Sequence, residues 1–248
     1  MKNKILFISS THGNESFSIP VFEALEKDYP RNVYKYDWII GNAKAVEKDV
    51  RFIDTDLNRS APGSLKSNVY EEHRAAEIIE LSKEYEMVID VHGTRSDFGI
   101  VKIIPYPSYA NLLLAGMFPV TKNVVWYSND SIQKGPLVQF THCPAIELEC
   151  GDKQDSRTAI LLKQTLIEFL ENMKNPYVIM TQFKKQEIYS VYGKETNDSV
   201  HRVDFEKVVK DNETFYPFLT KNGYSDVSYY KMKKILMEEL FDDRNKTQ

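Results

Sequence analysis

Two histidines in this sequence each follow a short apolar run, and an acidic residue accompanies the first of them. Ile5–Ile8 leads into His12 and Glu15, and Met87–Val91 leads directly into His92. Such runs are typical of buried strands, and ligands of open α/β sheets bind at the carboxyl ends of strands. Two imidazoles and one carboxylate leave an open position on a tetrahedral zinc ion, as catalytic zinc sites do. Because an isolated His-x-x-Glu pair is a weak signal, the second histidine carries much of this inference.

Three further carboxylates lie on the predicted strands. Asp90 precedes His92 by two residues, so both project from one face of a strand. There Asp90 can accept a hydrogen bond from a ligand histidine, or it can simply accept backbone N–H groups at the strand end. Glu147 and Glu149 share one face of the segment Ala145–Cys150. Near a metal-activated water a buried carboxyl group is suited to accept and donate a proton, and the alternative is a salt bridge to a loop lysine or arginine.

A polar segment between residues 43 and 66 supplies cationic groups. It contains Arg51, Asn58 and Arg59, and long loops in compact domains are usually functional. Arginine offers a fork of donors to a carboxylate, and asparagine adds a further donor. A guanidinium beside the metal can also stabilise the oxyanion of a tetrahedral intermediate. The alternative is a solvated charged loop.

The elements that must position these residues alternate between strands and helices as far as residue 174. This alternation predicts an α/β domain with a mainly parallel or mixed sheet. After residue 175 the sequence becomes β-leaning, and a terminal amphipathic helix is predicted at 227–241. Asn68 and Glu71 fit a capping box at the start of one helix. The predicted strands are 5–8, 33–40, 87–91, 100–105, 124–127 and 145–150, and the other predicted helices are 16–25, 68–85, 110–118 and 156–173.

Composition and charge exclude several classes of protein. The chain has 248 residues, 42% of them hydrophobic, which suits one large domain or one domain with a small appendage. A net charge of −4 argues against general nucleic-acid binding, and no stretch approaches the roughly 20 apolar residues of a membrane span. The first apolar run is too short for a secretion signal, so we expect a cytoplasmic protein. Cys143 and Cys150 lie too far apart on one extended segment to form a disulfide.

Four motifs occur in order along roughly residues 4–173. They are Thr11-His12-Gly13-Asn14-Glu15, the stretch from Asn42 to Arg59, Asp90-Val91-His92-Gly93-Thr94 and Ile146-Glu147-Leu148-Glu149-Cys150-Gly151. In this order and spacing they resemble the succinylglutamate desuccinylase/aspartoacylase family, which belongs to the zinc carboxypeptidase group. The resemblance implies a three-layer α/β/α fold with a mixed central sheet. It also implies a zinc-dependent catalytic domain at 1–174 and a small β-rich C-terminal subdomain at 175–248 that covers the active site.

The resemblance implies one zinc ion per chain, held by His12, Glu15 and His92. It also implies a glutamate general base two residues before a glycine. That position is Glu149, and Glu147 is the register alternative because both face the same way. Together these roles describe a zinc-dependent hydrolase that cleaves the amide bond of an N-acyl amino acid.

The same resemblance implies that Arg51 polarises the scissile carbonyl and that Asn58 and Arg59 hold a substrate carboxylate. The partner would be a small N-acyl amino acid, or a short peptide with a free carboxylate, and neither nucleic acid nor membrane is expected. Two departures from the family pattern bear on specificity. Segment 131–143 contains Lys134 but no arginine, and the substrate-contacting tyrosine has four candidates: Tyr192, Tyr224, Tyr229 and Tyr230.

Two other functions compete with deacylation. A zinc carboxypeptidase acting on peptides would share the same metal core, and an open groove would favour it, whereas a closed C-terminal lid would favour small substrates. A non-catalytic binding homologue would lack a ligand or the base, and neither is missing. The acyl group, the amino acid, the pathway and homo-oligomerisation stay open. Three histidines without motif support are assigned to surface or packing roles: His73, His142 and His201.

Overall fold

A large mixed sheet forms the centre of the chain. The computed structural model describes residues 5–126, 134–175, 177, 181, 184–196, 198, 200–221 and 226–241. Within these residues ten strands are joined in the order β2-β1-β3-β6-β4-β5-β7-β10-β9-β8. Four adjacent strands are parallel to one another: β2 (Tyr36–Ile40), β1 (Ile5–Ser9), β3 (Met87–Thr94) and β6 (Ala145–Asp152). β4 (Ile100–Ile104) is antiparallel to β6, and β5 (Lys122–Val125) is parallel to β4.

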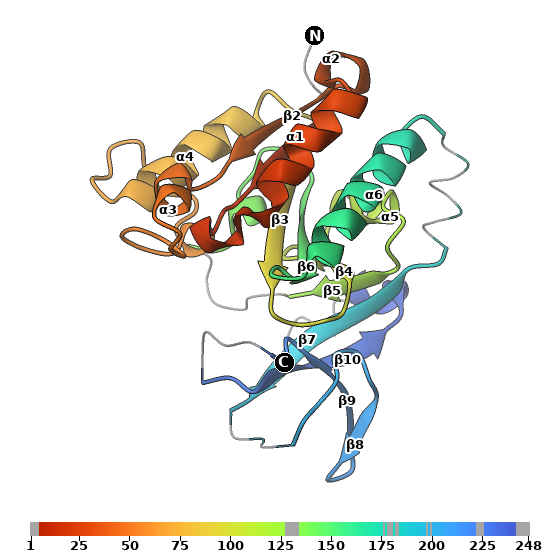
Figure 1. Ribbon diagram of the computed structural model, residues 1–248. Helices are drawn as coiled ribbons and strands as arrows, with labels where there is room; N and C mark the ends of the chain where they lie inside the picture. Colours follow the sequence, from red (N-terminus) through yellow and green to blue (C-terminus); the bar gives the residue numbers. More distant parts are fainter. Residues whose placement is uncertain are drawn as a thin grey trace.

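Helices cover both faces of the sheet (Figure 1). On one face Phe7 of β1 meets Phe22 at a ring-centroid distance of 5.4 Å. On the other face Leu6 joins Ala75 in a separate buried cluster. Neighbouring residues of β1 therefore face opposite layers, as strand geometry requires, and the predicted three-layer α/β/α fold is confirmed. The first face carries α1 (Ile19–Asp28), α5 (Tyr109–Gly116) and α6 (Ser156–Asn172), and the second carries α4 (Tyr70–Ser82).

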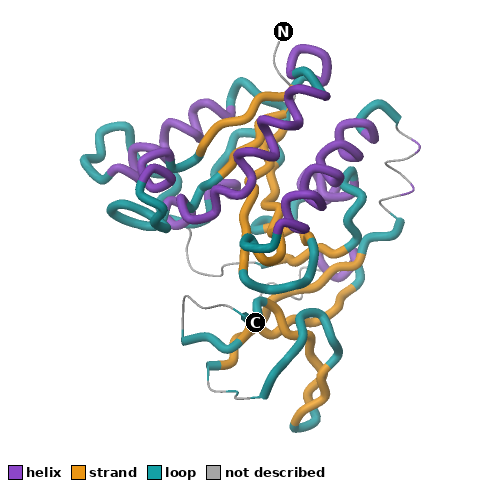
Figure 2. The backbone as a smooth tube through the Cα atoms, in the orientation of Figure 1, coloured by secondary structure: helices purple, strands orange, loops and turns teal. Residues whose placement is uncertain are grey.

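The part of the chain after residue 175 consists mostly of strands and loops (Figure 2). β7 (Glu187–Glu195) runs parallel to β5 and continues the same sheet, and β10 (Tyr229–Ile235), β9 (Glu213–Phe218) and β8 (Val208–Lys210) follow it in antiparallel order. A third buried cluster joins this part to β4, and it includes Ile103, Phe218 and Met232. The C-terminal part is β-rich, as expected, while the division at residues 174 and 175 stays a prediction.

The predicted terminal helix at 227–241 is wrong. Residues Tyr229–Ile235 form β10, and only a 3-10 turn at Met237–Phe241 follows. The segment has helix-forming residues, but Tyr229 and Met232 are buried where β10 pairs with β7 and β9. Tertiary packing therefore overrides local preference here.

Two other elements begin later than predicted. The predicted helix at 16–25 starts as a 3-10 turn, η1 (Gly13–Ser18), before α1. The predicted strand at 33–40 starts with one helical turn, α2 (Arg31–Tyr34), which ends on left-handed Lys35 before β2. Cys143 and Cys150 are free, as expected. No helix among the residues with described positions is long and apolar enough to cross a membrane.

Candidate active site

The turn after β1 places His12 at the carboxyl end of the sheet. Gly13 lies against the backbone of α3 (Ala43–Glu47), where an added Cβ would come within 2.1 Å of the Ala45 carbonyl carbon. Its N–H donates to the Arg51 carbonyl oxygen at 3.1 Å. A side chain would therefore push this turn away from both neighbours, so Gly13 is required by close approach. β3 lies beside β1 and brings His92 to the same edge.

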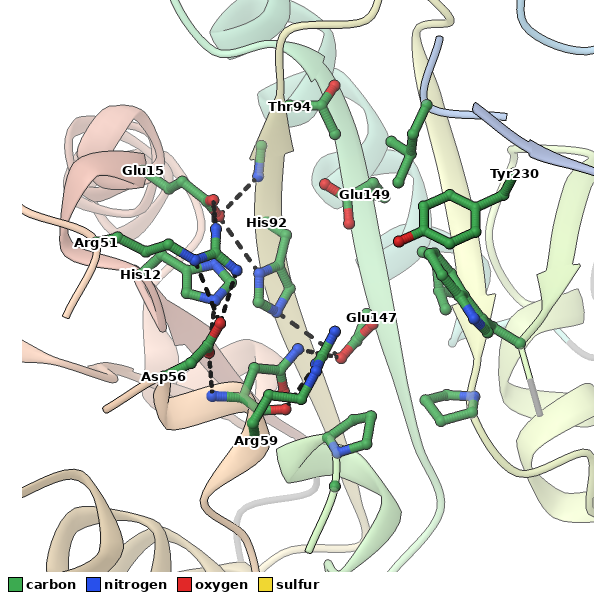
Figure 3. A pocket seen from close by; sticks show the side chains of 18 of the residues that line it. His12, Glu15, Arg51, Asp56, Arg59, His92, Thr94, Glu147, Glu149 and Tyr230 are labelled. Atoms are coloured by element: carbon green, nitrogen blue, oxygen red, sulfur yellow. Dashed lines mark hydrogen bonds and ion pairs between the residues drawn. The ribbon is translucent and has the colours of Figure 1, made fainter. Parts of the chain in front are cut away.

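The Glu15 carboxylate lies between the two imidazoles (Figure 3). His12 Nδ1 is 3.0 Å from Glu15 Oε1, and His92 Nδ1 is 3.3 Å from Glu15 Oε2. The Gly93 N–H donates to Oε2 at 3.1 Å and fixes the carboxylate plane. All three side chains are buried, with exposed fractions of 4%, 3% and 3% for His12, Glu15 and His92. The three residues predicted to bind zinc are thus brought together.

The Nε2 atom of each imidazole, on the far side of the ring from Glu15, contacts a second carboxylate. His12 Nε2 lies 3.0 Å from Asp56 Oδ1, and His92 Nε2 lies 3.0 Å from Asp90 Oδ2. Asp90 also accepts a hydrogen bond from the Thr11 hydroxyl at 2.7 Å. Carboxylates in this position fix the ring orientation of metal-binding histidines. Of the two roles considered for Asp90, support of a ligand histidine matches its contacts.

The electrostatics of this cluster favour bound positive charge. Burial alone would lower the pKa of His92, but Asp90, Glu15 and Glu147 outweigh it and raise that pKa well above the ordinary value. Burial would likewise lower the pKa of His12, and Glu15 with Asp56 raises it instead. Burial would raise the pKa of Glu15, yet the two imidazoles hold it well below the usual range. A cluster that favours a proton on each imidazole through nearby carboxylates is also suited to bind a metal cation.

The donor set fits zinc. Donor atoms of His12, Glu15 and His92 all lie within 4.8 Å of one another, and two imidazoles with one carboxylate are the ligands of many catalytic zinc sites. A second grouping, Asp90 with His92 and Glu147, meets the same distance limit. The second grouping has one imidazole only, and its Asp90 already accepts a hydrogen bond from the Thr11 hydroxyl, so the first grouping is the better candidate.

Asp56 links this cluster to Arg51 and was not singled out from the sequence. Its Oδ2 accepts from Arg51 Nε at 3.2 Å and from Nη2 at 2.9 Å, while Oδ1 faces His12. Arg51 Nη1 lies 3.7 Å from Glu15 Oε1, so the guanidinium is held beside the candidate metal site. Burial opposes the ionisation of Asp56, but His12 and Arg51 hold its pKa well below the usual range.

Replacing Asp56 with Asn is expected to weaken zinc binding by about 10- to 100-fold, because it removes the charged support of His12. Competition with a chromophoric chelator measures the affinity. Asp54→Asn is the matched control, since Asp54 lies on the same loop and its carboxylate accepts the Tyr70 N–H at 2.9 Å, with no contact to His12 among the described residues. Equal zinc affinity in the two variants would contradict the role assigned to Asp56.

Both polar atoms of the Asn58 side-chain amide form hydrogen bonds within the protein. Nδ2 donates to Glu147 Oε1 at 2.8 Å, and Oδ1 accepts the Leu137 N–H at 2.9 Å. The Arg59 side chain is exposed at the pocket edge and donates to the Asn58 carbonyl oxygen at 2.8 Å. Asn58 therefore positions Glu147, and only its second Nδ2 hydrogen is available for a substrate.

The two glutamates of β6 differ in their surroundings. Glu147 is buried and held by Asn58, whereas no hydrogen bond within the described part of the chain restrains the Glu149 carboxylate. Burial, with further repulsion from Glu15 and Glu147, raises the pKa of Glu149 to about 8. A carboxyl group with a raised pKa, facing a pocket, suits proton transfer near neutral pH. This difference favours Glu149 over its register alternative as the base.

The candidate metal ligands, both arginines and the two glutamates of β6 line one cavity of about 490 Å³. Figure 3 shows Tyr230 across the cavity from His12, Glu15 and Arg51, with its hydroxyl directed toward the two glutamates. The Tyr192 hydroxyl instead donates to Glu213 at 2.6 Å and the Tyr229 hydroxyl to Asp198 at 2.7 Å, both outside this cavity. The fourth candidate, Tyr224, lies outside the described residues.

The remaining side chains considered from the sequence lie at the rim or elsewhere. Lys134 lines the cavity edge, where it forms an ion pair with Glu72. His73 is near Glu77 on the exposed side of α4, at 3.3 Å. None of the three histidines without motif support lines this cavity, and two of them, His142 and His201, are exposed. Lys153, which was not singled out, has a buried side chain whose Nζ is 3.9 Å from Glu15 Oε1.

Glu71 anchors the loop that carries Arg51 and Asp56. Its buried carboxylate accepts the backbone N–H groups of Ile53, Asp54 and Thr55 at 2.7, 3.0 and 3.2 Å, and it accepts Asn42 Nδ2 at 3.0 Å. The predicted capping box is wrong, because α4 begins after Val69 without a side-chain cap. The partners of Glu71 lie in a distant loop, which local sequence cannot indicate.

Glu71→Gln is expected to lower the free energy of unfolding by about 1–3 kcal/mol, since an amide NH₂ replaces an acceptor that faces backbone donors. Urea unfolding measures this change. Glu72→Gln is the matched control, because Glu72 is the neighbouring residue and its carboxylate contacts Ser67 and Lys134 in part-exposed positions. The free energy of unfolding should fall clearly less in Glu72→Gln than in Glu71→Gln, because exposed ion pairs contribute little to stability. A loss of similar size in both variants would refute the anchoring role.

Comparison with known proteins agrees with this arrangement. Residues 2–135 match the sequence model described as the succinylglutamate desuccinylase/aspartoacylase catalytic domain, which is more than half of the chain. The chain belongs to this family. A "Probable aspartoacylase" of Prochlorococcus marinus (strain AS9601) is 32% identical over 163 residues, which are 60% of this chain and 54% of the relative. The chain spans about half the length of the curated relatives it matches.

A further relative and two solved structures are also similar to this member of the family. The N-acyl-aromatic-L-amino acid amidohydrolase (carboxylate-forming) of Xenopus laevis is 33% identical over 110 residues, which are 39% of this chain and 36% of that protein. Murine aminoacylase 3 superposes with a TM-score of 0.72 at 16% identity, over 94% of this chain and 95% of that one. Succinylglutamate desuccinylase from Chromobacterium violaceum gives 0.67 at 15%, over 95% and 86%. At these identities the structural likeness establishes the fold alone.

Proposed function

We propose that this chain is a zinc-dependent hydrolase that cleaves the amide bond of N-acyl amino acids. The observation that carries the proposal is the buried set of His12, Glu15 and His92, which faces Glu149 across one cavity. The family includes proteins named for removing acyl groups from amino acids, among them the relatives described above. A metal site with an adjacent carboxyl base is suited to amide hydrolysis.

In the proposed reaction, the zinc ion and the residues of the chain have separate roles. A bound zinc ion would supply Lewis acidity that polarises the acyl carbonyl and acidifies a water molecule. Glu149 takes a proton from the attacking water and then passes it to the leaving amine. Arg51, held by Asp56, donates to the oxygen that becomes negative in the tetrahedral intermediate. Arg59 and the remaining Nδ2 hydrogen of Asn58 orient the substrate carboxylate.

We further propose that residues 1–174 supply the catalytic groups and that residues 175–248 form a subdomain over them. Leu219, Lys221 and Tyr230 come from this second part and line the same cavity. A wall at this position favours a small substrate over an extended peptide chain. Peptides are therefore the second candidate substrate, and a cytoplasmic location stays an expectation.

Metal analysis combined with hydrolysis assays tests this function. We expect about one zinc ion per chain in the purified protein and release of free amine from at least one N-acyl amino acid in a panel that varies both halves. The same panel should include dipeptides and tripeptides with a free carboxylate, and these should be cleaved more slowly. A wild-type protein that binds no metal and hydrolyses none of these compounds would overturn the proposal.

A further inference from the structure

Two segments from different parts of the chain line the cavity and contact each other. Residues 94–96 lie at the end of β3, which carries His92, and Leu219 and Lys221 follow β9 in the C-terminal part. The Lys221 N–H donates to Ser96 Oγ at 3.4 Å, which is a long hydrogen bond. The position of the C-terminal wall relative to the metal-binding strand therefore depends on further contacts that hold these two segments together.

The Asp204 carboxylate binds the C-terminal segment through both of its oxygens. Oδ1 accepts the Thr220 N–H at 3.0 Å, and Oδ2 accepts the Thr220 hydroxyl at 3.0 Å. Burial raises the pKa of Asp204 above its ordinary value, although interactions with Thr220 and Ser96 oppose the rise. Asp204 thus interacts with both cavity-lining segments, but it does not itself line the cavity.

The backbone beside each partner of this contact is in the left-handed region. Leu219, next to Thr220, has a φ of 57°, and Phe205, next to Asp204, has a φ of 64°. Neither residue is glycine, so each conformation costs free energy and persists only where its surroundings fix it. The Phe205 N–H donates to the Pro217 carbonyl oxygen at 2.9 Å and joins the two turns. Because Leu219 lines the cavity, the contacts that maintain its conformation also maintain the shape of the wall.

Three phenylalanines next to these residues pack on one another. The Phe98 ring centroid lies 5.5 Å from that of Phe218 and 6.1 Å from that of Phe205. Phe205 and Phe218 are 5.5 Å apart, and all three rings belong to or pack against the third buried cluster. Apolar packing is not directional, so it holds the three chain segments together without fixing the course of the polar loop. The directed hydrogen bonds of Asp204 supply that restraint.

We propose that Asp204 is a positioning residue for substrate binding, because it holds residues 219–221 against residues 94–96 and thereby fixes this wall of the cavity. The inference rests on the proposed hydrolase function and adds a residue that acts on the substrate only through its neighbours. Loss of the contact should let Leu219 and Lys221 move, which lowers the affinity for substrate. The metal-binding residues and Glu149 are not partners of Asp204, so the chemical step should change little.

Steady-state kinetics test this role. Asp204→Ala removes both hydrogen bonds to Thr220 and should raise KM for the preferred N-acyl amino acid by about 10-fold or more, while kcat stays within about threefold. Its zinc content should equal that of wild type. Asp204→Asn should return KM to within about threefold of the wild-type value, because its amide can accept the Thr220 N–H and donate to the Thr220 hydroxyl oxygen. An unchanged KM in Asp204→Ala, or a fall in kcat alone, would overturn the proposal.

Asp198→Ala is the matched control for these kinetics. Asp198 belongs to the same part of the chain and accepts the Tyr229 hydroxyl at 2.7 Å and the Val200 N–H at 3.0 Å. Neither Asp198 nor these two partners lines the active-site cavity. We expect KM in this variant to stay within about threefold of wild type. An equal rise of KM in both variants would mean a general disturbance of the C-terminal part and would contradict a specific role of Asp204.

Hydrogen exchange separates this inference from the proposed function, because it requires neither metal nor turnover. In Asp204→Ala, backbone amides in peptides covering residues 94–98 and 217–221 should exchange about 10-fold faster or more than in wild type. Asp198→Ala should leave exchange in both peptides unchanged. If wild type hydrolyses no compound but exchange follows this pattern, the hydrolase proposal fails and the role of Asp204 in holding the wall stands. If exchange in the two peptides is the same in Asp204→Ala and wild type, that role is refuted.

Discussion

Glu149→Gln should lower kcat for amide hydrolysis by about 100- to 10,000-fold, the usual contribution of a general acid–base group. Gln has nearly the same shape as Glu but cannot accept the proton of the attacking water. The zinc content should not change, because Glu149 is not among the three predicted ligands. KM should change little for the same reason. Steady-state assays over a range of substrate concentrations, with metal content determined on the same sample, measure these three expectations.

Glu147→Gln is the matched control for the base. Both residues are on one face of β6, but Asn58 Nδ2 already occupies Glu147 Oε1. We expect a loss in kcat below about 10-fold, from a shift of Asn58 rather than from loss of proton transfer. A larger loss in Glu147→Gln than in Glu149→Gln would reverse the assignment of the base.

The raised pKa of Glu149 gives an independent check on the metal-free protein. Its pKa in the folded state is about 8, above the ordinary value of 4.5, so the unfolded state releases this proton first as the pH rises. Through this group, the free energy of unfolding therefore falls as the pH rises from about 4.5 to about 8. Metal-free Glu149→Gln should gain free energy of unfolding relative to metal-free wild type across this range. Parallel stability curves would contradict the burial of this carboxyl group.

The central fold could be predicted because its signals are local. Ile5–Ile8 is a continuous apolar run, and Met87–Val91 is apolar apart from Asp90. Both form neighbouring parallel strands. The terminal segment could not be predicted in this way. Its lysines and leucines suit a helix, but burial of Met232 between β7 and β9 decides for a strand. That pairing partner is distant in sequence.

The candidate site divides in the same way. The three predicted ligands lie in short motifs at strand ends, so the sequence could bring them together. The contacts of Asp56 and Glu71 could not be predicted, because one pairs with an imidazole 44 residues away and the other with backbone groups of a separate loop. The contact between Asn58 and Glu147, which favours Glu149 as the base, joins residues 89 positions apart, so the sequence leaves both registers open.

Removal of the metal is expected to abolish hydrolysis, and added zinc should restore it, because no other group in the described cavity can polarise an acyl carbonyl as strongly. Zinc should also raise the free energy of unfolding, by about 4 kcal/mol at a free concentration 1,000 times Kd. Chelation, dialysis and titration with zinc, followed by activity and thermal unfolding of each sample, measure both effects. His92→Gln is the variant that should respond to zinc in neither assay.

The pH dependence of this stabilisation has a definite sign. In the metal-free protein the pKa values of His12 and His92 are raised. Their contribution to stability is therefore full below about pH 6.5 and is lost as the pH rises through the raised values. Zinc must displace the same protons, so its stabilising effect should grow over that range. Unfolding curves with and without zinc should diverge as the pH rises above the ordinary histidine pKa of about 6.5, and curves that converge instead would contradict binding through these two imidazoles.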